Sequence, residues 1–474
     1  MTNTFLKEIT DNWNREARRE DIGRYFYFYK EVNQIAQGKK SYVIGRKGSG
    51  KTAMSEYLFN MNNENNVFSK RLSFADFPYQ QLYGLNDNRY AKKSEYITIW
   101  KYIIYSSVCE LMLANSRVNE DVRHLLAGTY QKDVLTELPR KVEKWTSSNF
   151  IIPNITNTDV DIISWTQKIY LQEDILKEYI DNSTYFILID GLDDDYTANY
   201  RNDPDQFTQY NNVITSLFKA IHSIKESFIG KNTKIYPVLF LRDDIFKNIR
   251  DNDRTKWGDL SIEIDWDRDK IRKMLAFRIT RVFDPDTQKA LPFNEAWLKL
   301  FSKYYVEYGN KQSKQMHSYD FIDRMTQLRP RDYIEYIRAC CSRAYLKGAS
   351  QVSPDIVRSE EKAFSNYLRS ETIDEVFPVL PEIETIFTIL SEVSTTNSFS
   401  IDSFKEAFNN YVQRKELNEA NVDYVLQVLF DFNIIGNLPK PNFSVFRYKN
   451  KEAKLNRKEK LIVNRGLFKS LQIV

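Results

Sequence analysis

Eight residues near the start of the chain constrain its fold more than any other feature. They read Gly45-Arg46-Lys47-Gly48-Ser49-Gly50-Lys51-Thr52 and satisfy the pattern G-x-x-x-x-G-K-[ST]. The apolar stretch Ser41–Ile44 precedes them, and a helical pattern over Thr52–Phe59 follows. A glycine-rich loop between a strand and a helix directs successive backbone N–H groups at an anion. This context predicts a phosphate-binding loop and disfavours the alternative, a glycine-rich turn with a chance lysine.

The residue types in this loop match the chemistry of a nucleoside triphosphate. We expect Lys51 to reach the β- and γ-phosphates as a catalytic residue, and the Thr52 hydroxyl to serve as a hard oxygen ligand for Mg²⁺. The predicted cofactors are therefore ATP and Mg²⁺. The residues of this segment that we predict to bind the nucleotide are Gly45, Arg46, Lys47, Gly48, Ser49, Gly50, Lys51, Thr52 and Ala53.

A second apolar run supplies the acidic partner of the loop. Tyr185–Ile189 is continuous and apolar, which is typical of a buried parallel strand, and Asp190 follows at its carboxyl end. We expect Asp190 to hold Mg²⁺ through water. Hydrolysis also needs a carboxylate that positions or deprotonates the attacking water, and Asp193 and Asp194 lie just beyond the strand. One of them is the predicted catalytic base. Which one stays open, and a solvated acidic turn is the alternative.

A third apolar run, Ile235–Leu241, ends at Arg242. Charge that develops on a transferred phosphoryl group must be neutralised, so we predict Arg242 as a catalytic γ-phosphate sensor. Asp243 and Asp244 adjoin it, and a local ion pair without a catalytic part is an equal alternative.

A further pair of arginines opens a predicted helix over Tyr333–Leu346, in the sequence Arg329-Pro330-Arg331-Asp332. We predict that Arg329 or Arg331 reaches the nucleotide phosphates from a lid. The alternative is a capped helix with solvated arginines.

Five apolar stretches alternate with helical patterns, which predicts an α/β fold with a parallel sheet covered on both faces. These stretches are 41–44, 71–75, 185–189, 235–241 and 260–264. Beyond Asp267 the pattern is helical as far as about Ser370, with no strand-like alternation. Three helices and the alternating stretch Phe443–Tyr448 follow, an order typical of a winged helix.

With 474 residues, the chain is long enough for several domains. The predicted fold class is an α/β P-loop NTPase of the ASCE type, with a helical insertion, a helical lid and a C-terminal winged-helix domain. The predicted limits are 1–40 for a lead-in segment, 41–285 for the core with its insertion at about 76–182, 286–372 for the lid and 373–474 for the winged helix.

Composition favours a globular, water-facing protein, with 42% hydrophobic and 28% charged residues and a mean hydropathy of -0.54. The first residues show no signal peptide, and no stretch approaches the roughly 20 apolar residues of a membrane span. We therefore expect a cytoplasmic protein without a membrane partner. The three histidines and three cysteines lack metal-ligand spacing, so no structural zinc site is expected.

The net charge is only +4, but residues 441–474 hold nine Lys or Arg against Glu452 and Glu459. This basic tail is either a contact for duplex DNA or an acidic protein, or a solvated face. The residues that best support DNA binding are Lys451, Lys454, Arg457, Lys458 and Lys460.

Taken together, the motifs resemble the bacterial STAND and KAP-like branch of P-loop ATPases, close to the origin-recognition type of AAA+ proteins. The segments that carry the resemblance are GRKGSGKT at 45–52, LIDGLDD at 188–194, FLRDDIF at 240–246 and RPRD at 329–332. The resemblance implies phosphate and magnesium ligands at Lys51, Thr52 and Asp190. It also implies sensor positions at Arg242 and at Arg329 or Arg331. That group often has Glu where this chain has Asp194, a departure that favours slow hydrolysis or a switch role.

The resemblance further implies an ATP-controlled switch in signalling, stress response or anti-phage defence, coupled to a partner protein that carries the sensor or effector. The winged helix would dock DNA or protein, and a homo-oligomer would complete each site with a neighbour's arginine. A second hypothesis is a non-hydrolysing, ATP-dependent DNA-binding regulator. A third, a P-loop kinase, is disfavoured by the acidic pair after Asp190 and by the large lid.

Overall fold

The computed structural model describes residues 4–61, 66–73, 92–130, 134, 165–192, 204–394 and 398–473. It divides into two compact units, which we describe separately. The sheet unit consists of Phe28–Arg46 and Lys51–Ile264. The helical unit consists of Met1–Tyr27, Lys47–Gly50 and Asp265–Val474, so the tip of the glycine-rich loop groups with the second unit.

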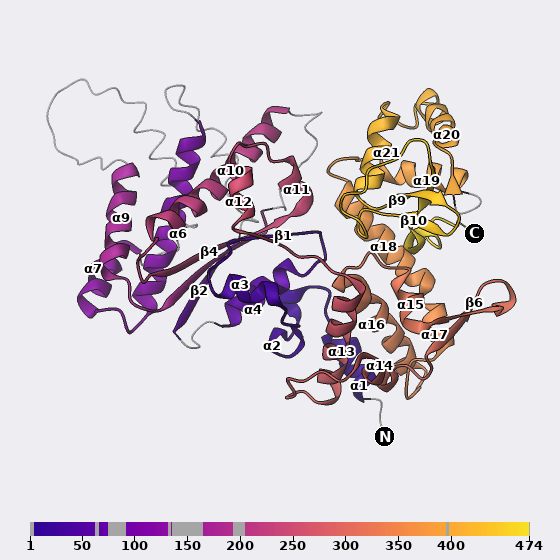
Figure 1. The fold of residues 1–474 in the computed structure, drawn as a ribbon, viewed down its shortest axis with the longest axis horizontal. Coiled ribbons are helices and arrows are strands. Elements are labelled where there is room, and N and C mark those ends of the chain that lie inside the picture. The colour runs from indigo at the N-terminus through magenta and orange to yellow at the C-terminus, as the bar shows by residue number, and fades with distance from the viewer. Residues whose placement is uncertain are drawn as a thin grey trace. The chain divides into compact units, whose positions relative to one another are not determined.

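A five-stranded sheet with parallel pairing throughout forms the centre of the sheet unit (Figure 1). Its strand order is β2-β3-β4-β1-β5. The inner strands are almost entirely buried, because helices cover both faces and the strands are rich in apolar residues. The predicted α/β P-loop fold is therefore confirmed. The strands are β1 (Tyr42–Gly45), β2 (Val67–Ser73), β3 (Thr184–Asp190), β4 (Lys234–Arg242) and β5 (Ser261–Glu263).

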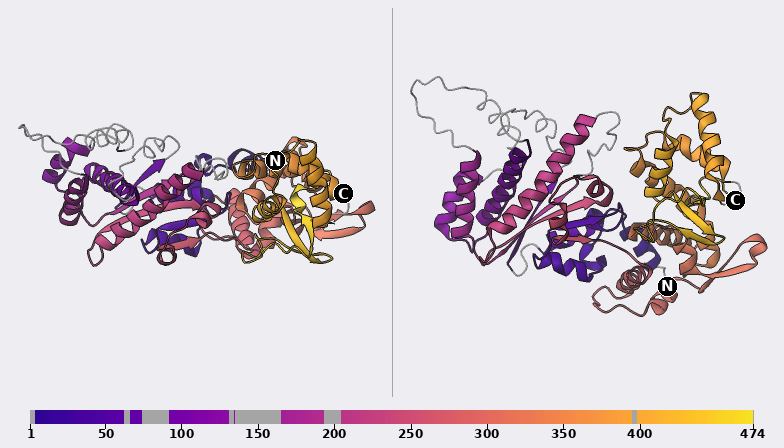
Figure 2. Two further views of the ribbon diagram at one scale, coloured as in Figure 1. Left: turned by 90° about the horizontal axis from the view of Figure 1, so that it is seen from above. Right: turned by 45° about the horizontal axis from the view of Figure 1, so that its top comes forward.

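The helices of the sheet unit include the predicted insertion between β2 and β3. The longest described helix of the insertion, α6, packs against α9 and α10. Figure 2 shows these three helices side by side. The described helices are α3 (Lys30–Ala36), α4 (Lys51–Asn60), α6 (Lys92–Ala114), α7 (Glu120–Tyr130), α9 (Trp165–Tyr179), α10 (Pro204–Ser227), α11 (Asp243–Asn248) and α12 (Arg254–Gly258).

Helix α6 also differs from one expectation. Its segment Tyr96–Ala114 is long and apolar enough to cross a membrane by length and composition, with a mean hydropathy of 1.3. The prediction from the sequence that no stretch is long and apolar enough to span a membrane is therefore wrong for this helix. Most of the segment is buried inside the protein, and the Trp100 indole donates to the carbonyl of Val213 in α10 at 3.0 Å. Such burial is typical of a core helix, whose apolar surface is covered by its neighbours.

The helical unit combines helices of the N-terminal segment with helices from the later part of the chain. Helix α1 packs against α13 and α16, so the first residues of the chain belong to this unit. Its helices are α1 (Thr4–Asn12), α2 (Ile22–Tyr25), α13 (Arg268–Phe283), α14 (Phe293–Leu300), α15 (Ser318–Asp323), α16 (Pro330–Leu346), α17 (Pro354–Ser359) and α18 (Glu361–Val376).

A β-hairpin interrupts these helices and contradicts the expectation of an all-helical stretch. Strands β6 (Tyr305–Tyr308) and β7 (Lys314–His317) pair antiparallel between α14 and α15. Each strand has only four residues, too few for a clear alternation in sequence. Tertiary packing stabilises the hairpin instead, because Val306 is fully buried and Tyr308 lies against Phe321 of α15.

The C-terminal part of the helical unit has the three predicted helices followed by strands, except that the short strand β8 lies between the first and second helix. A small sheet with strand order β10-β9-β11-β8 accompanies the helices, and its described pairs are antiparallel. The winged-helix assignment stays a prediction, as do the four domain limits. The elements are α19 (Ile383–Val393), β8 (Ser398–Phe399), α20 (Ile401–Gln413), α21 (Val422–Asp431), β9 (Ile435–Lys440), β10 (Phe443–Val445) and β11 (Lys460–Val463).

A buried ion pair joins the N-terminal segment to α13. The Arg278 guanidinium donates to both carboxylate oxygens of Glu20, with Nη1 at 3.0 Å from Oε2, and both side chains are only 5% exposed. The same guanidinium lies 4.6 Å from the centroid of the Trp13 ring and 5.2 Å from that of Tyr25. Tyr25 is thus a residue of the apolar core, 1% exposed.

We predict that Glu20→Ala strongly destabilises the helical unit, because it leaves the Arg278 charge buried without its carboxylate. The expected loss in the free energy of unfolding is about 3–5 kcal/mol. Glu16→Ala is the matched control, since Glu16 pairs with Arg19 at 3.0 Å on an exposed surface. That change should cost about 0–1 kcal/mol. Urea denaturation measures both, and equal losses would contradict the structural role of the buried pair.

Candidate nucleotide-binding site

The glycine-rich loop connects β1 to α4 through two residues in the left-handed region. Gly48 has a φ of 78° and Gly50 a φ of 100°, conformations that side chains with a Cβ adopt only with strain. Gly45 is the last residue of β1, and α4 begins at Lys51. Consecutive residues curled in this way form an anion-binding concavity of backbone N–H groups next to a helix N-terminus.

Lys51 is almost completely buried at the start of α4. Its ammonium group donates to the carbonyls of Gly45 at 2.9 Å and Arg46 at 3.2 Å. These are backbone oxygens of the loop itself. The lysine is therefore held where the loop curls, in the position that the sequence predicts for a phosphate ligand.

Two hydroxyl groups of the loop fit the predicted nucleotide. The Ser49 Oγ is buried and has no hydrogen-bond partner among the described residues. Thr52 is half-buried, and its hydroxyl likewise makes no hydrogen bond within the described part of the chain. A buried hydroxyl without a partner costs about 1–3 kcal/mol, which a bound ligand would recover. Together with the Lys51 ammonium group and the Asp190 carboxylate, these hydroxyl groups fit a triphosphate and Mg²⁺.

Asp190 lies at the carboxyl end of β3, as predicted. It is 8% exposed, and its Oδ1 accepts from the backbone N–H of Gly191 at 3.0 Å. Because β3, β4 and β1 are neighbouring parallel strands, Asp190, Arg242 and Gly45 end at the same edge of the sheet. Asp193 and Asp194 lie outside the described residues, so the catalytic base stays a prediction.

Arg242 lies in the position that the sequence predicts but is engaged locally. It is the residue of β4 opposite Gly45, so it stands beside the start of the loop. Its guanidinium makes two hydrogen bonds to the Asp244 carboxylate, Nε to Oδ1 at 3.0 Å and Nη2 to Oδ2 at 2.7 Å. The ion pair that was the alternative to a sensor is thus present, and the sensor role stays a prediction.

Asp243 is a residue whose proximity to the loop the sequence analysis missed. Burial alone would raise the pKa of its carboxyl, but the positive charges of Lys247, Arg46 and Lys51 lower it below the usual value. Lys247 lies 2.7 Å from its Oδ2. The carboxylate therefore stays ionised within the field of the loop lysine. Its position directly after a strand that ends near the loop is the only sequence signal that could have indicated it.

Within the helical unit, the tip of the loop makes contacts with three further elements. The indole N–H of Trp266 donates to the Ser49 carbonyl at 2.8 Å, and the tryptophan is buried. A Cβ added at Gly48 would lie 3.3 Å from the Cβ of Arg331 in α16. Lys47 pairs with Glu371 of α18 at 3.7 Å. No sequence motif marks Trp266 or Glu371, which therefore escaped prediction.

The two predicted lid arginines differ sharply in their surroundings. Arg329 is 3% exposed, and its Nε donates to both oxygens of Asp332 at 3.1 Å while Nη1 donates to Glu375 at 3.3 Å. Arg331 is more exposed and donates to the Glu371 carboxylate at 3.0 Å. Both arginines lie near Gly48 at the loop tip and both have carboxylate partners, and a contact with phosphate stays a prediction.

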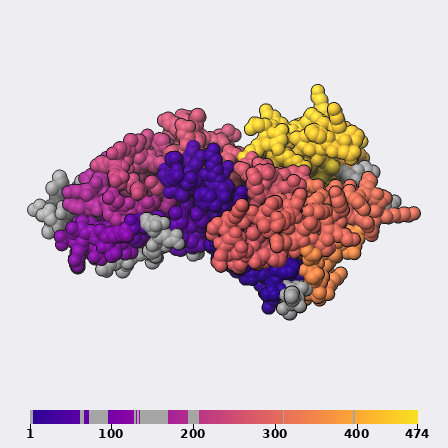
Figure 3. All heavy atoms as spheres, turned by 60° about the horizontal axis from the view of Figure 1, so that its bottom comes forward, coloured from indigo at the N-terminus to yellow at the C-terminus, as the bar shows by residue number. Residues whose placement is uncertain are grey.

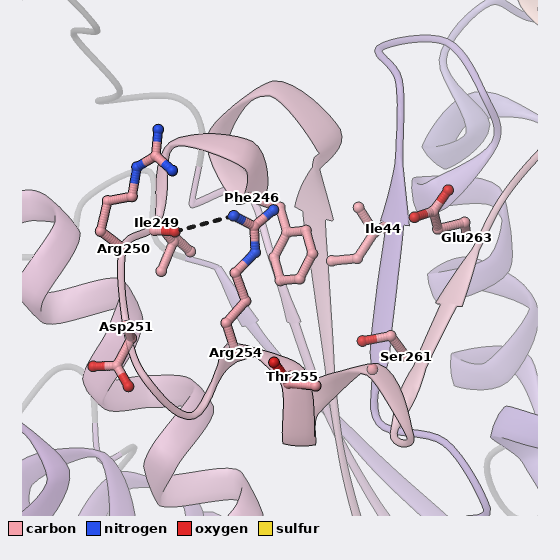
Figure 4. Close-up of a pocket in the computed structure, with 10 residues that line it drawn as sticks. Ile44, Phe246, Ile249, Arg250, Asp251, Arg254, Thr255, Ser261 and Glu263 are labelled. Carbon is pink, nitrogen blue, oxygen red and sulfur yellow. Dashed lines mark hydrogen bonds between the residues drawn. The ribbon is translucent and has the colours of Figure 1, made fainter. Parts of the chain in front are cut away.

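A separate open pocket of about 580 Å³ lies in the sheet unit, beside β1 and β5 (Figure 4). Arg254 stacks on the Phe246 ring at 4.9 Å, and its Nη1 is 3.4 Å from the carbonyl oxygen of Ile249. Neither Arg250 nor Arg254 has a carboxylate partner among the described residues, since the nearby Asp251 pairs with Lys219 at 3.1 Å. The pocket is thus lined by two guanidinium groups that form no ion pair with a described carboxylate, together with the carboxylates of Asp251 and Glu263.

Comparison with known proteins adds one family match. Residues 269–372 match the model of the FunZ-associated C-terminal helical domain. This segment, less than half of the chain, runs from α13 to α18 and contains both lid arginines and Glu371. A search of curated proteins found no match.

Two solved structures illustrate what the fold is similar to. Cdc6p from Pyrobaculum aerophilum has 11% identity over 93% of this chain and 89% of its own, with a TM-score of 0.32. Drosophila ORC, in a structure bound to DNA, has 13% identity over 94% of this chain and 84% of its own, with a TM-score of 0.28. These values carry no assignment of residues, so the roles discussed below rest on the geometry of this chain.

We predict that Gly48→Ala impairs nucleotide binding beyond its effect on stability. Gly230→Ala is a matched control, because Gly230 has a φ of 75° and open space around its Cβ position. Each change should cost about 1 kcal/mol of stability through the left-handed backbone. Only Gly48→Ala disturbs the loop and crowds Arg331, which should weaken ATP binding on the order of tenfold or more. Thermal unfolding and fluorescent-nucleotide titration measure the two effects. Equal affinities of the two variants would refute the prediction.

Proposed function

We propose that this protein is an ATP-binding and ATP-hydrolysing switch of the AAA+ type, related to STAND and origin-recognition ATPases. The observation that carries the proposal is the loop after β1, in which Lys51 is held over the loop carbonyls and the buried Ser49 hydroxyl lacks a partner. The order of the four sequence motifs along the chain supports the assignment to this type.

In this proposal, different residues of the chain take part in separate steps of hydrolysis. Lys51 exchanges the carbonyls of Gly45 and Arg46 for phosphate oxygens and neutralises their charge. Asp190 and Thr52 would hold Mg²⁺, and the ion would supply positive charge that offsets the charge of the phosphates. Asp193 or Asp194 positions the attacking water. Arg242 acts as a sensor only after it leaves Asp244, so its ion pair opposes the active state.

The proposal includes a cytoplasmic location and a partner protein that supplies the sensor or effector, in stress response or anti-phage defence. It rests on the motif resemblance, and the described elements form a nucleotide-binding sheet unit and a helical unit without a further domain among them. A switch of this kind acts through the different affinities of its nucleotide states for the partner.

The C-terminal domain is proposed to dock protein, because the exposed side of α21 is acidic. Asp423, Gln427 and Asp431 follow at helical spacing on that side. Arg457 pairs with Asp423 at 3.2 Å and Arg447 with Asp431, so these basic residues are already neutralised. These pairs cancel the charge of both partners, and α21 itself holds no basic residue, so this helix presents no excess positive charge to a phosphate backbone.

DNA binding remains the second candidate, supported by the rest of the basic tail. Lys454, Lys458 and Lys460 are exposed and have no carboxylate partner among the described residues. In Figure 3 the residues nearest the C-terminus, in yellow, form an exposed surface. This reading requires a steep dependence of binding on salt concentration.

We further propose a homo-oligomer in which one copy supplies an arginine to the nucleotide of another. The pocket beside β1 and β5 supports this part, because Arg250 and Arg254 lack carboxylate partners in the described chain and open to the surface. A guanidinium group stabilises transition-state charge when it is delivered to the transferred phosphoryl group.

A mixing experiment tests this arrangement. Arg250→Ala/Arg254→Ala and Lys51→Ala should each lose turnover, on the order of 10³-fold for the arginine variant. A mixture should regain activity, because the Lys51→Ala copy still offers its arginines to the intact loop of the other. Lys256→Ala is the control, since Lys256 lies on the same helix and pairs with Asp253 at 2.9 Å. A mixture of folded variants that stays inactive contradicts the shared site.

Steady-state ATP turnover of the purified protein tests the central proposal. We expect slow hydrolysis that falls on the order of 10²-fold or more in Lys51→Ala and Asp190→Ala and disappears on removal of Mg²⁺. Turnover is measured with and without duplex DNA, and a DNA-dependent rise would favour the second candidate for the C-terminal domain. Tight ATP binding without turnover would favour the non-hydrolysing regulator. Absence of nucleotide binding would overturn the assignment.

A further inference from the structure

The tip of the loop and the lid form a closed cluster of charges in the helical unit. Three cations and three carboxylates pair there in two groups, one around Glu371 and one around Arg329, and their formal charges sum to zero. The cations are Lys47, Arg329 and Arg331, and the carboxylates are Asp332, Glu371 and Glu375. Each cation that binds a phosphate must exchange one of these partners for it.

Arg329 is fixed within this cluster. Asp332 is fully buried, accepts the guanidinium at both oxygens and also accepts the backbone N–H of Gln327 at 2.9 Å. Release of Arg329 would leave a buried carboxylate without its counter-ion, which is strongly destabilising. The residue therefore anchors the start of α16 and is poorly suited to change partners.

Arg331 and Lys47 are held more loosely. Their side chains are 27% and 25% exposed, and the one carboxylate that pairs with them among the described residues is that of Glu371. The contacts measure 3.0 Å from Arg331 and 3.7 Å from Lys47, and both reach the same Oε2 of Glu371. Exposure lowers the cost of breaking these contacts, because water replaces the lost partner.

We infer that Glu371 is a positioning residue that occupies Lys47 and Arg331 in place of a nucleotide phosphate, and that Arg331 is the lid arginine that reaches the phosphate. This inference rests on the proposed function. The base of the Arg331 side chain adjoins Gly48, so the arginine already stands at the loop tip. A phosphate at this tip meets Glu371 as a like charge, and the carboxylate must withdraw before the nucleotide is fully bound.

Protonation does not remove this competition at neutral pH. Burial would raise the pKa of the Glu371 carboxyl, but the charges of Lys47, Arg331 and Arg329 lower it below the usual value. The carboxylate therefore stays ionised at neutral pH, where it opposes the phosphate.

Equilibrium binding of a fluorescent ATP analogue with Mg²⁺ tests the inference. Glu371→Gln removes the competing charge and should tighten binding about tenfold, within the range typical of coupled equilibria. Glu371→Asp keeps the charge and should stay near the wild type. Glu375→Gln is the matched control, because Glu375 is a carboxylate of the same helix that pairs with the anchored Arg329. It should not tighten binding.

A second pair of variants keeps the inference falsifiable if Glu371→Gln fails to fold. Arg331→Gln should weaken binding about tenfold with an unchanged melting temperature. Arg329→Gln should instead lower the melting temperature, because it leaves Asp332 buried and unpaired. Unchanged affinity in Arg331→Gln overturns the inference.

The outcomes separate the inference from the proposed function. Wild-type binding without tightening in the folded Glu371→Gln variant overturns the role of Glu371 and leaves the nucleotide site intact. Binding that appears only in Glu371→Gln supports the inference in its strongest form. Absence of binding in both proteins overturns the proposed function and the inference with it.

Discussion

The left-handed backbone of the loop after β1 is the constraint on which the site depends. Gly48 and Gly50 take φ values that other residues adopt only with strain, and α4 begins immediately afterwards at Lys51. A loop in this conformation points polar groups inward and leaves the Ser49 hydroxyl buried without a described partner. Hydrogen bonds hold the loop in this conformation: Lys51 donates to two loop carbonyls, and Trp266 donates to the Ser49 carbonyl. The loop is therefore preorganised for an anion, which lowers the entropic cost of binding.

The features predicted correctly from the sequence are those encoded locally. The glycine pattern marks the loop, and continuous apolar runs mark β3 and β4, because strands buried on both faces need no polar alternation. The carboxyl ends of these strands then locate Asp190 and Arg242 at one edge. The β6–β7 hairpin was missed because its strands are too short to show a period. Its stability comes from tertiary packing, because Val306 is buried and Tyr308 lies against Phe321 of α15.

The site residues that escaped prediction act across long separations in the chain. Trp266 lies 217 positions from the Ser49 carbonyl to which it donates. Glu371 lies in the middle of α18, with no motif around it, and reaches the loop through Lys47. Even where the sequence located a residue correctly, it left the partner open: Arg242 adjoins two aspartates, and only the structure shows that the guanidinium pairs with Asp244. Ion-pair choice depends on side-chain geometry that a linear pattern does not contain.

Pairing of the cations with protein carboxylates gives the proposed switch its physical basis. A solvated arginine can bind a phosphate without breaking an ion pair. An arginine that is already paired must first break its contact with a carboxylate. Arg242 with Asp244 and Arg331 with Glu371 are both in this position. Each exchange would change which charged protein groups are paired, so the nucleotide-bound and nucleotide-free states would differ in electrostatic energy as well as in contacts. A ligand shifts an equilibrium only through such a difference, and here the difference resides in the carboxylates that the nucleotide displaces.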